Sequence, residues 1–303
     1  MYRLLLFNEV KSIYYPKSFQ YYSPNNVEEA LELLDKLSGE AKLLAGGQSL
    51  LLLMKLRIFS PKYIIDLNKL SSILSYIKEE DEYIRIGALT THNDIAENFL
   101  ISQKVTALSE AASTIADYAV RNVGTLGGSI SHADPAANYP PALLVLDSIV
   151  KVRSINSERE IKFNDFIKGP FETALNPNEM VVEVKVRKHS PNTTSTFIKK
   201  ELSKGDFGIV NIAVKLGLEE DRCREIKIAV GGINPKPVRL VEAEKVLEGK
   251  VINDENINKL GEVAASEVKP QSDIRASAEY RRQLIRVYTR RAVKICYERL
   301  IKK

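Results

Sequence analysis

Two periodicities of apolar residues alternate along the chain, and each predicts a different kind of element. Residues 23–34 begin with polar side chains and continue with apolar ones at helical spacing, which is typical of an amphipathic helix. Residues 180–186 alternate along their length as a half-buried strand does. Strands and helices interleave up to about residue 190, and three strands followed by three helices form the last third, so the pattern predicts an α+β chain. The predicted helices are 23–34, 49–57, 90–96, 107–119, 240–247, 256–268 and 276–299, and the predicted strands are 42–45, 63–67, 83–88, 148–152, 160–163, 180–186, 196–200, 209–217 and 223–231.

Polar residues 189–195 interrupt this order and are interpreted as a linker. They precede a last unit of about a hundred residues, which is a normal size for a domain. Residues 1–15 have little periodic pattern, so the fold itself is expected to begin near Pro16.

The central stretch, residues 120–138, is rich in glycine and small hydroxyl residues. Asp134 is a good helix N-cap and Pro135 suits the first helical position, so a buried helix is predicted from that point. Glycines without a Cβ let backbone N–H groups crowd around an anion, which makes this loop a candidate phosphate cradle. The cradle residues are Thr125, Leu126, Gly127, Gly128 and Ser129.

A second glycine loop lies upstream, between a predicted strand and a predicted helix. That context suits phosphate binding at a helix N-terminus, and two such loops indicate a ligand with two phosphates, which is a dinucleotide. The alternative for either loop alone is a tight turn at a strand–helix junction. Neither loop matches the Rossmann or P-loop pattern, and no hydrolase motif is present. The residues of this loop are Ala45, Gly46, Gly47, Gln48, Ser49 and Leu50.

A third candidate segment, residues 197–208, consists of a strand, a charged turn and the start of another strand. It is either a solvated hairpin tip or a tip that leans over a ligand. In the second interpretation Phe207 stacks on a planar ring and Lys199 lies near an electron-rich edge. His92, one of three histidines, is interpreted as a capping or packing residue rather than a catalytic one.

Composition and charge exclude several classes of function. The net charge of +5 is spread along the chain, without a basic arm, so a nucleic-acid partner is not expected. Cys223 and Cys296 are too few for an iron–sulfur cluster and are interpreted as thiols in a reducing compartment. Apolar runs are too short for a signal peptide or a membrane span, so a soluble, cytoplasmic protein is expected.

Both glycine loops resemble one family. Residues 45–50 resemble the A-G-G-x-S-L loop of the FAD-binding medium subunit of molybdenum hydroxylases, the carbon monoxide dehydrogenase, xanthine dehydrogenase and aldehyde oxidoreductase type. Residues 121–129 and 132–137 resemble the R-N-x-G-T-x-G-G-S/N and H-A-D-P-A-A patterns of that family. The match extends from about Tyr15 to the C-terminus and includes residues 87–92, 228–239 and 275–282.

The resemblance implies a fold and a set of contacts. The fold has two α/β subdomains of the PCMH-type FAD-binding fold, residues 1–67 and 68–190, and a C-terminal flavoprotein domain, residues 191–303, with a three-stranded antiparallel sheet and helices. The two loops would hold the pyrophosphate and ribityl chain of FAD between the subdomains. Asn138 stands where the family often has a carboxylate, and its amide can still hydrogen-bond a hydroxyl. Phe207 stands where the family commonly has a Tyr beside the flavin, and Lys199 is a hypothetical donor to the flavin N1/C2 carbonyl.

The implied function is electron transfer within an oxidoreductase complex. A molybdopterin large subunit would oxidise an aldehyde or related substrate, 2Fe–2S clusters on a small subunit would relay electrons, and FAD on this chain would pass them to an external acceptor. The assembly would be a heterotrimer or a dimer of heterotrimers. Two alternatives remain open, a stand-alone FAD-dependent oxidase with its own substrate site and a non-catalytic module that serves assembly only.

Overall fold

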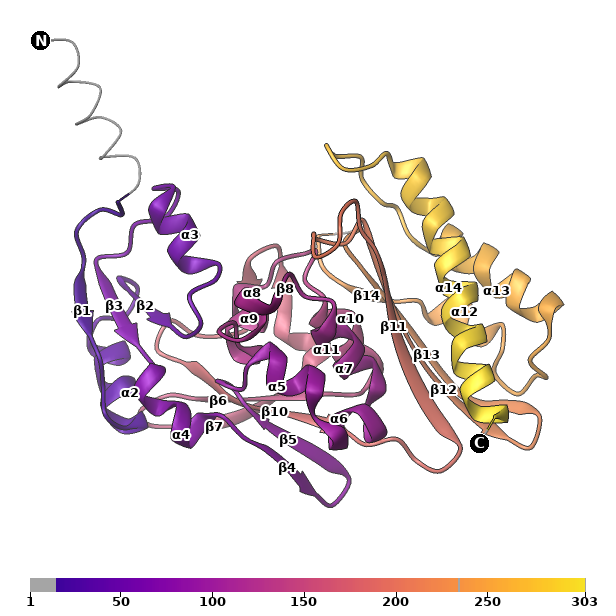
Figure 1. Cartoon of the computed structure of the whole chain (residues 1–303), viewed down its shortest axis with the longest axis horizontal. Coiled ribbons are helices and arrows are strands. Elements are labelled where there is room, and N and C mark those ends of the chain that lie inside the picture. Colours follow the sequence, from indigo (N-terminus) through magenta and orange to yellow (C-terminus); the bar gives the residue numbers. More distant parts are fainter. Residues whose placement is uncertain (1–14, 234, 303) are drawn as a thin grey trace, which may run out of the picture.

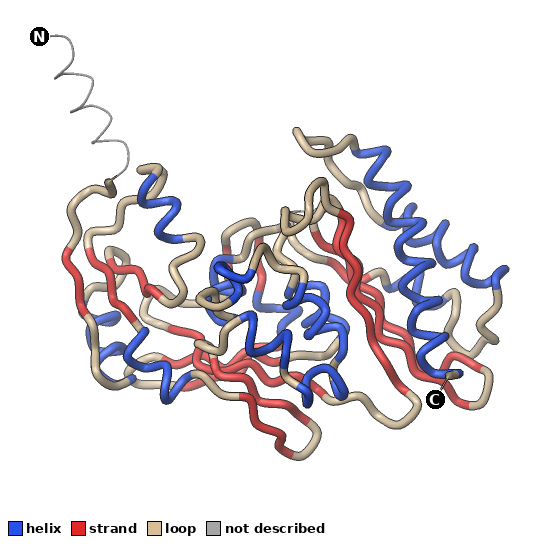
Figure 2. The backbone as a smooth tube through the Cα atoms, viewed as in Figure 1, coloured by secondary structure: helices blue, strands red, loops and turns tan. Residues whose placement is uncertain are grey.

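Three larger sheets follow one another along an elongated molecule, and β8 and β9 form a fourth sheet of two strands (Figure 1). The structure, a computed structural model, describes residues 15–233 and 235–302. The expected N-terminal extension lies outside these residues except for Tyr15. Helices and strands are both abundant (Figure 2), and the predicted α+β class is confirmed.

The first sheet has three parallel strands in the order β1-β3-β2. Helix α2 packs on it because its buried residues Val27, Ala30, Leu31 and Leu34 recur at helical spacing. Asn26 caps this helix by accepting a hydrogen bond from the backbone N–H of Glu29. The sequence pattern did not predict β1, which has only three residues. The elements are β1 (Gln20–Tyr22), α2 (Val27–Lys36), β2 (Ala41–Leu44), α3 (Leu50–Lys55), β3 (Tyr63–Asp66), η1 (Asn68–Leu70) and α4 (Ser71–Leu74).

The second sheet is antiparallel and has the order β4-β5-β10-β6-β7. Strand β10 comes last in sequence and lies at the centre, as its nearly continuous burial requires. The helices that pack against this sheet bury one large apolar core. The elements are β4 (Ile77–Glu80), β5 (Tyr83–Gly87), α5 (His92–Glu97), α6 (Phe99–Lys104), α7 (Thr106–Ser113), α8 (Tyr118–Arg121), α9 (Leu126–His132), α10 (Tyr139–Val145), β6 (Ile149–Arg153), β7 (Glu158–Lys162), α11 (Phe163–Phe166), β8 (Ile167–Gly169), β9 (Glu172–Thr173) and β10 (Met180–Arg187).

The third sheet lies between two layers of helices. One of its faces meets α7 and α10, and the other is covered by α12, α13 and α14 (Figure 1). The expected three antiparallel strands are present, and a two-residue fourth strand, β14, extends them. The elements are β11 (Thr193–Lys200), β12 (Val210–Glu219), β13 (Arg222–Gly231), β14 (Val238–Arg239), α12 (Val241–Lys245), α13 (Asp254–Glu267) and α14 (Ala278–Ile301).

Three local predictions are wrong. The predicted helix 107–119 is broken into α7 and α8, because Ala116 has a φ of 40° and Asp117 caps a new helix. The helix expected from Asp134 begins only at Tyr139, and the Asp134 carboxylate bonds the N–H of Ala136 instead. The end of the predicted linker, from Thr193, belongs to β11.

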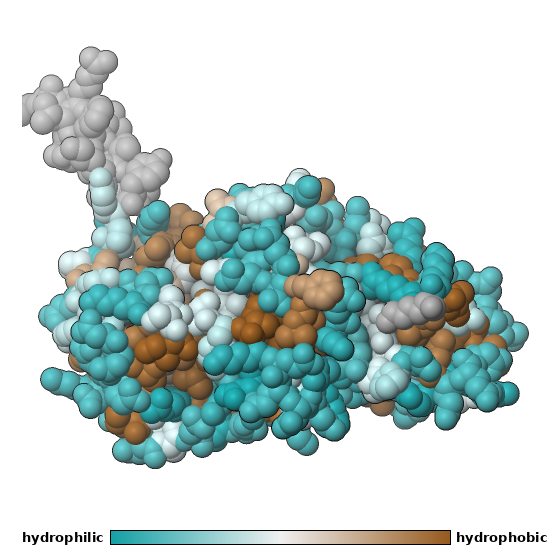
Figure 3. Space-filling model, turned by 60° about the horizontal axis from the view of Figure 1, so that its bottom comes forward, coloured by the Kyte–Doolittle hydropathy of each residue, from teal (hydrophilic) through white to brown (hydrophobic). Residues whose placement is uncertain are grey.

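Polar side chains dominate the face shown in Figure 3, where apolar ones gather in several separate patches. Among the described residues, no helix is both long and apolar enough to cross a membrane. Separate patches of this kind are normal for a protein surface.

Glu110 joins the second unit to the C-terminal unit. Its carboxylate accepts hydrogen bonds of 2.8 Å from the hydroxyl of Thr196 and from the backbone N–H of Phe197. Arg299 of α14 pairs with the other carboxylate oxygen and also donates to the carbonyl of Ser195. One side chain of α7 therefore holds both β11 and α14.

We expect Glu110→Gln to lower the free energy of unfolding by about 1–3 kcal/mol, because the amide presents a donor where the carboxylate accepts. Urea denaturation at neutral pH measures this loss. Glu262→Gln is the matched control, since Glu262 also pairs with an arginine, Arg286, but is 57% exposed. Its expected cost is below about 1 kcal/mol. Equally small losses of unfolding free energy in both variants would contradict the conclusion that Glu110 holds β11 and α14 together.

Candidate cofactor-binding site

The structure brings the two predicted glycine loops into direct contact. A Cβ added to Gly46 would lie 2.1 Å from the carbonyl oxygen of Val123 and 2.7 Å from the Cα of Gly124. A Cβ on Gly128 would lie 3.8 Å from the Cβ of Ala45. These loops are more than seventy residues apart in sequence, and only glycine permits backbones to approach so closely.

The first loop has unpaired backbone donors. Within the described part of the chain, no acceptor is found for the N–H groups of residues 46–50. Gly47 has a φ of +70°, which turns the chain there, and Ser49 makes no side-chain cap bond to α3. Consecutive N–H groups around a glycine turn are the donor set that binds an anionic phosphate. The residues present therefore fit the pyrophosphate of a dinucleotide.

The central loop is built differently from the open cradle that was expected. Its N–H groups are already used, because Leu126 donates to Thr90 at 3.0 Å and Gly127 donates to Ala88 at 2.8 Å. Thr125 caps α9 by accepting from the N–H of Gly128 at 3.2 Å. A Cβ on Gly127 would lie 2.7 Å from the carbonyl oxygen of Ala88. This glycine therefore serves packing within the protein.

The central loop can contact a ligand only through its accessible residues. Gly128 is exposed and Ser129 is half-buried, whereas Thr125, Leu126 and Gly127 are buried. Gly128, which approaches Ala45, and the neighbouring Ser129 are therefore the accessible residues of this loop. The sequence analysis expected N–H donors at both loops. In the structure the N–H groups of residues 46–50 are unpaired, whereas those of residues 126–129 are used within the protein.

His92 packs against the central loop and is hydrogen-bonded to it. Its N–H donates to the carbonyl of Gly124 at 2.9 Å, and its ring Nδ1 lies 3.0 Å from the hydroxyl of Tyr139. Burial lowers the pKa of His92 to about 4, and the charge of Arg121 adds to this effect. The ring is therefore neutral at pH 7. Thr91 is the N-cap of α5, so His92 is a packing residue, as its interpretation from the sequence favoured.

Arg121 fixes the turn between α7 and α8. Its guanidinium is buried, donates to the carbonyls of Ile115 and Ala116 at 2.8 and 3.0 Å, and stacks on the ring of Tyr118 at 4.4 Å. A Cβ on Gly205 would lie 2.9 Å from the same carbonyl of Ala116. The tip of the β11–β12 hairpin, which is the third segment singled out in the sequence, therefore packs on this turn.

Lys199 holds this hairpin tip and is not free to face a ligand. Its ammonium donates to the carbonyls of Thr114 and Asp206 at 2.7 and 2.8 Å and lies 2.6 Å from the carboxylate of Glu201. Only 3% of the side chain is exposed. Phe207 at the tip is 46% exposed and keeps surface available for stacking.

Two buried asparagine amides join segments that lie far apart in the sequence. Asn138 donates at 3.1 Å to the carbonyl of Ala111 and to the hydroxyl of Thr114. Its amide N–H groups therefore support the α7–α8 turn. Asn211 of β12, which the sequence interpretation missed, is fully buried and donates to the carbonyls of Ala136 and Ala137. The only sequence signal for Asn211 is a polar residue in an otherwise apolar strand.

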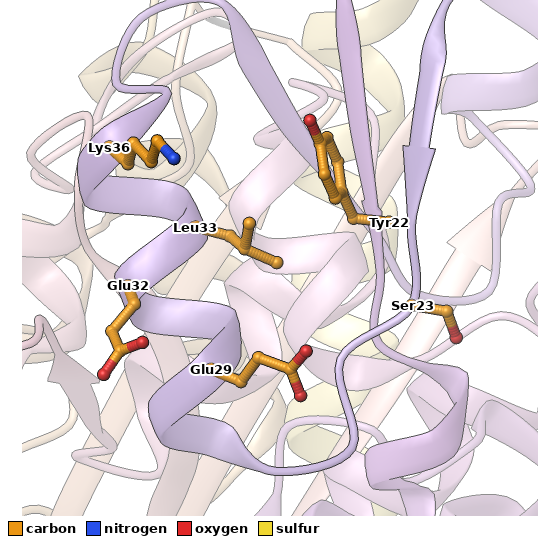
Figure 4. Close-up of a pocket in the computed structure, with 6 residues that line it drawn as sticks. All are labelled: Tyr22, Ser23, Glu29, Glu32, Leu33 and Lys36. Carbon is orange, nitrogen blue, oxygen red and sulfur yellow. The ribbon is translucent and has the colours of Figure 1, made fainter.

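A separate surface cavity of about 250 Å³ lies between β1 and α2, away from the glycine loops (Figure 4). Glu29 and Leu33 point from the helix toward the strand that carries Tyr22. Glu29 also accepts a hydrogen bond from the N–H of Asn25, and the lining contains a second carboxylate, Glu32. Two carboxylates outnumber the single ammonium of the lining, that of Lys36, and the resulting negative charge disfavours a phosphate, so this cavity does not suit a dinucleotide.

Comparison with known proteins agrees with the geometry. Residues 17–188 match the family of the FAD binding domain in molybdopterin dehydrogenase, and residues 196–295 match the CO dehydrogenase flavoprotein C-terminal domain. The chain belongs to this flavoprotein family. Two curated relatives share this architecture over nearly their whole length. The glyceraldehyde dehydrogenase medium chain of Sulfolobus acidocaldarius is 38% identical over 92% of this chain and 99% of its own length. The carbon monoxide dehydrogenase medium chain of Hydrogenophaga pseudoflava is 32% identical over 94% of this chain and 99% of its own.

Solved structures show the same fold. A carbon monoxide dehydrogenase from Hydrogenophaga pseudoflava that lacks the Mo-pyranopterin moiety superimposes with a TM-score of 0.90 at 33% identity, over 94% of this chain and 99% of that one. Quinoline 2-oxidoreductase from Pseudomonas putida 86 gives 0.89 at 30% identity, with the same coverage. The resemblance drawn from the glycine loops is confirmed, and FAD is the cofactor of the family.

Proposed function

We propose that this chain is the FAD-carrying electron-transfer subunit of a multi-subunit molybdenum hydroxylase. The observation that carries the proposal is the contact between the two glycine loops, with the unpaired N–H groups of residues 46–50 beside it. Relatives named as medium chains of dehydrogenases support the subunit role over a stand-alone oxidase. When bound, FAD supplies the redox chemistry of the complex.

The residues of the chain bind and orient the cofactor. The N–H groups of residues 46–50 would hold the pyrophosphate, with the hydroxyls of Ser49 and Ser129 as further donors. Ala45, Gly46, Gly47, Gln48 and Leu50 shape the first loop, and Thr125, Leu126, Gly127 and Gly128 shape the second. Phe207 would stack on the isoalloxazine ring. Lys199 and Asn138 position the hairpin tip and the α7–α8 turn, so we assign them a supporting role.

The remaining redox centres belong to partner chains in this proposal. In the described residues, no group of three or more His, Cys, Asp or Glu side chains could hold a metal ion. Cys223 and Cys296 are buried, and burial raises the pKa of Cys223 to about 12, so neither thiol is a ready ligand. We propose an iron–sulfur small subunit and a molybdopterin large subunit as partners, in a heterotrimer or a dimer of heterotrimers.

Domain boundaries and location complete the proposal. We propose boundaries at 67/68 and 190/191, and their position between the three larger sheets supports them. Two free, buried thiols favour the cytoplasm, where thiols stay reduced. The relative named for an aldehyde, the glyceraldehyde dehydrogenase medium chain, is 38% identical, against 32% for the carbon monoxide dehydrogenase medium chain. We therefore propose an aldehyde or a related compound as the substrate of the complex.

The absorption spectrum of the purified chain tests the function. We expect the spectrum to show flavin absorption bands whose intensity corresponds to about one FAD per chain. Heating should release intact FAD, which mass spectrometry identifies. Colour that stays in the denatured protein would mean covalent flavin and favour the stand-alone oxidase. A colourless protein that also fails to bind added FAD would contradict the proposal. The remaining interpretation would then be a non-catalytic module that serves assembly only.

A further inference from the structure

Residues 275–282 resemble the family pattern, yet the site described above gives them no role. The first of them, Arg275, stacks its guanidinium over the ring of Phe207, 5.3 Å from the ring centroid. The same guanidinium lies 3.8 Å from the carboxylate of Asp206. Figure 1 shows the β11–β12 turn and the segment before α14 at the same end of the C-terminal unit. The stretch therefore reaches the hairpin tip from a distant part of the sequence.

Asp273 fixes the backbone of Arg275. One of its carboxylate oxygens accepts from the N–H of Arg275 at 2.9 Å and from that of Ala276 at 3.1 Å. The guanidinium of Arg281 donates to the same oxygen at 2.6 Å. Burial opposes the charge of this carboxylate, but the hydrogen bonds outweigh it and lower the pKa of Asp273. Asp273 is therefore an anionic anchor at neutral pH.

Arg281 connects this anchor to the rest of the site. It is 3% exposed and donates to the carbonyls of Ile209 and Gly232. Gly232 in turn donates its N–H to the carbonyl of Pro135 at 3.0 Å. A continuous series of hydrogen bonds thus runs from the central stretch through Arg281 and Asp273 to the residue that stacks on the hairpin tip.

We propose that Arg275 is a positioning residue that fixes the ring plane of Phe207 for stacking on the isoalloxazine ring of FAD. The inference rests on the proposed function, because it needs FAD as the ligand. Arg275 lies over the ring, yet Phe207 is still 46% exposed, so part of its surface remains available to a ligand. A ring that is already immobilised loses less side-chain entropy when a ligand stacks on it. Stacking of a guanidinium on an exposed aromatic ring is strong enough to change affinity about two- to five-fold.

The absence of tryptophan from the sequence allows a direct test on the protein without cofactor. Phe207→Trp introduces a single indole, and acrylamide quenching with fluorescence anisotropy reports how firmly it is held. In this background we expect Arg275→Gln to raise the quenching constant about twofold. The reason is that roughly half of the surface of residue 207 is covered when Arg275 is present, and the substitution removes part of that cover. Arg291→Gln is the matched control, because Arg291 stacks on Tyr288 at the same 5.3 Å in α14. Equal quenching in both variants would overturn the inference.

FAD titration of the otherwise unmodified chain gives the second measurement. Arg275→Gln should weaken FAD binding about two- to five-fold, Arg275→Lys should fall between it and the unmodified chain, and Arg291→Gln should bind as the unmodified chain does. Equal affinity in all four proteins would overturn the positioning role and leave the proposed function intact. If the unmodified chain fails to bind FAD, the proposed function is wrong and the inference loses its ligand.

Discussion

Replacing Gly46 by alanine is expected to weaken FAD binding about ten- to a hundred-fold. The new Cβ would lie 2.1 Å from the carbonyl oxygen of Val123, so one loop must move by about 1 Å or more. Both neighbours are backbone atoms, and neither can escape by rotating a side chain. Forcing an extra methyl group into such a contact costs about 1–3 kcal/mol, and each 1.4 kcal/mol is a factor of ten in affinity.

The measurement is the dissociation constant of FAD, with the melting temperature of the protein without cofactor recorded beside it. Gly169→Ala serves as the control, because a Cβ there meets only Glu172 at an ordinary 3.4 Å. A large loss of affinity with a small loss of stability would show that the junction of the loops forms the site. Unchanged FAD affinity in Gly46→Ala would show that the junction is structural only.

Strong periodicity made much of the fold predictable. The alternation over residues 180–186 corresponds to β10, and the apolar runs in 209–217 and 223–231 correspond to β12 and β13. Short elements escaped prediction, because three residues such as Gln20–Tyr22 carry no readable period. Their stability comes from pairing with a strand that is distant in sequence, here β3.

The linker prediction failed because hydroxyl side chains can be buried when their hydrogen bonds are satisfied. Ser195 is fully buried, yet its hydroxyl bonds the N–H of Ala107 and the ring of His189. Thr196 is satisfied by Glu110. A run of Thr and Ser therefore forms the first half of β11, an edge strand of the third sheet, and only the tertiary partners distinguish it from a loop.

The sequence singled out the two glycine stretches that the structure brings into contact, but it did not indicate which of their N–H groups stay unpaired. Gly127 and Gly128 have low intrinsic helix propensity, so the sequence indicated a loop where α9 forms. The helix exists because Thr125 caps it and because Ala88 and Thr90 accept its first N–H groups. Those acceptors lie in the segment directly after strand β5, and nothing in the sequence of the loop itself reveals them.

His92 is expected to make the protein less stable in acid. Its pKa is about 4 in the folded protein and about 6.5 in the unfolded chain, because the buried ring cannot be charged without losing its solvation. Above about pH 6.5 the ring is neutral in both states and the contribution to stability is fully present. As the pH falls toward about 4, only the unfolded chain takes up a proton at this residue, and stability falls by about 3 kcal/mol.

The measurement is urea denaturation of the unmodified chain and of His92→Asn between pH 4 and pH 7. The asparagine amide can still bond the hydroxyl of Tyr139 but does not titrate, so the variant should lose this part of the pH dependence. Tyr139→Phe removes the hydrogen bond and keeps the burial, and it should retain the full slope because burial is the main cause of the shift. Equal slopes in the unmodified chain and His92→Asn would contradict the prediction. The ring of His92 also packs against the central loop, since a Cβ added to Gly124 would lie only 2.7 Å from its Nε2, and Gly124 is where the first loop approaches at Gly46. Charging the ring should therefore disturb the loop junction, and FAD should be released over the same pH range.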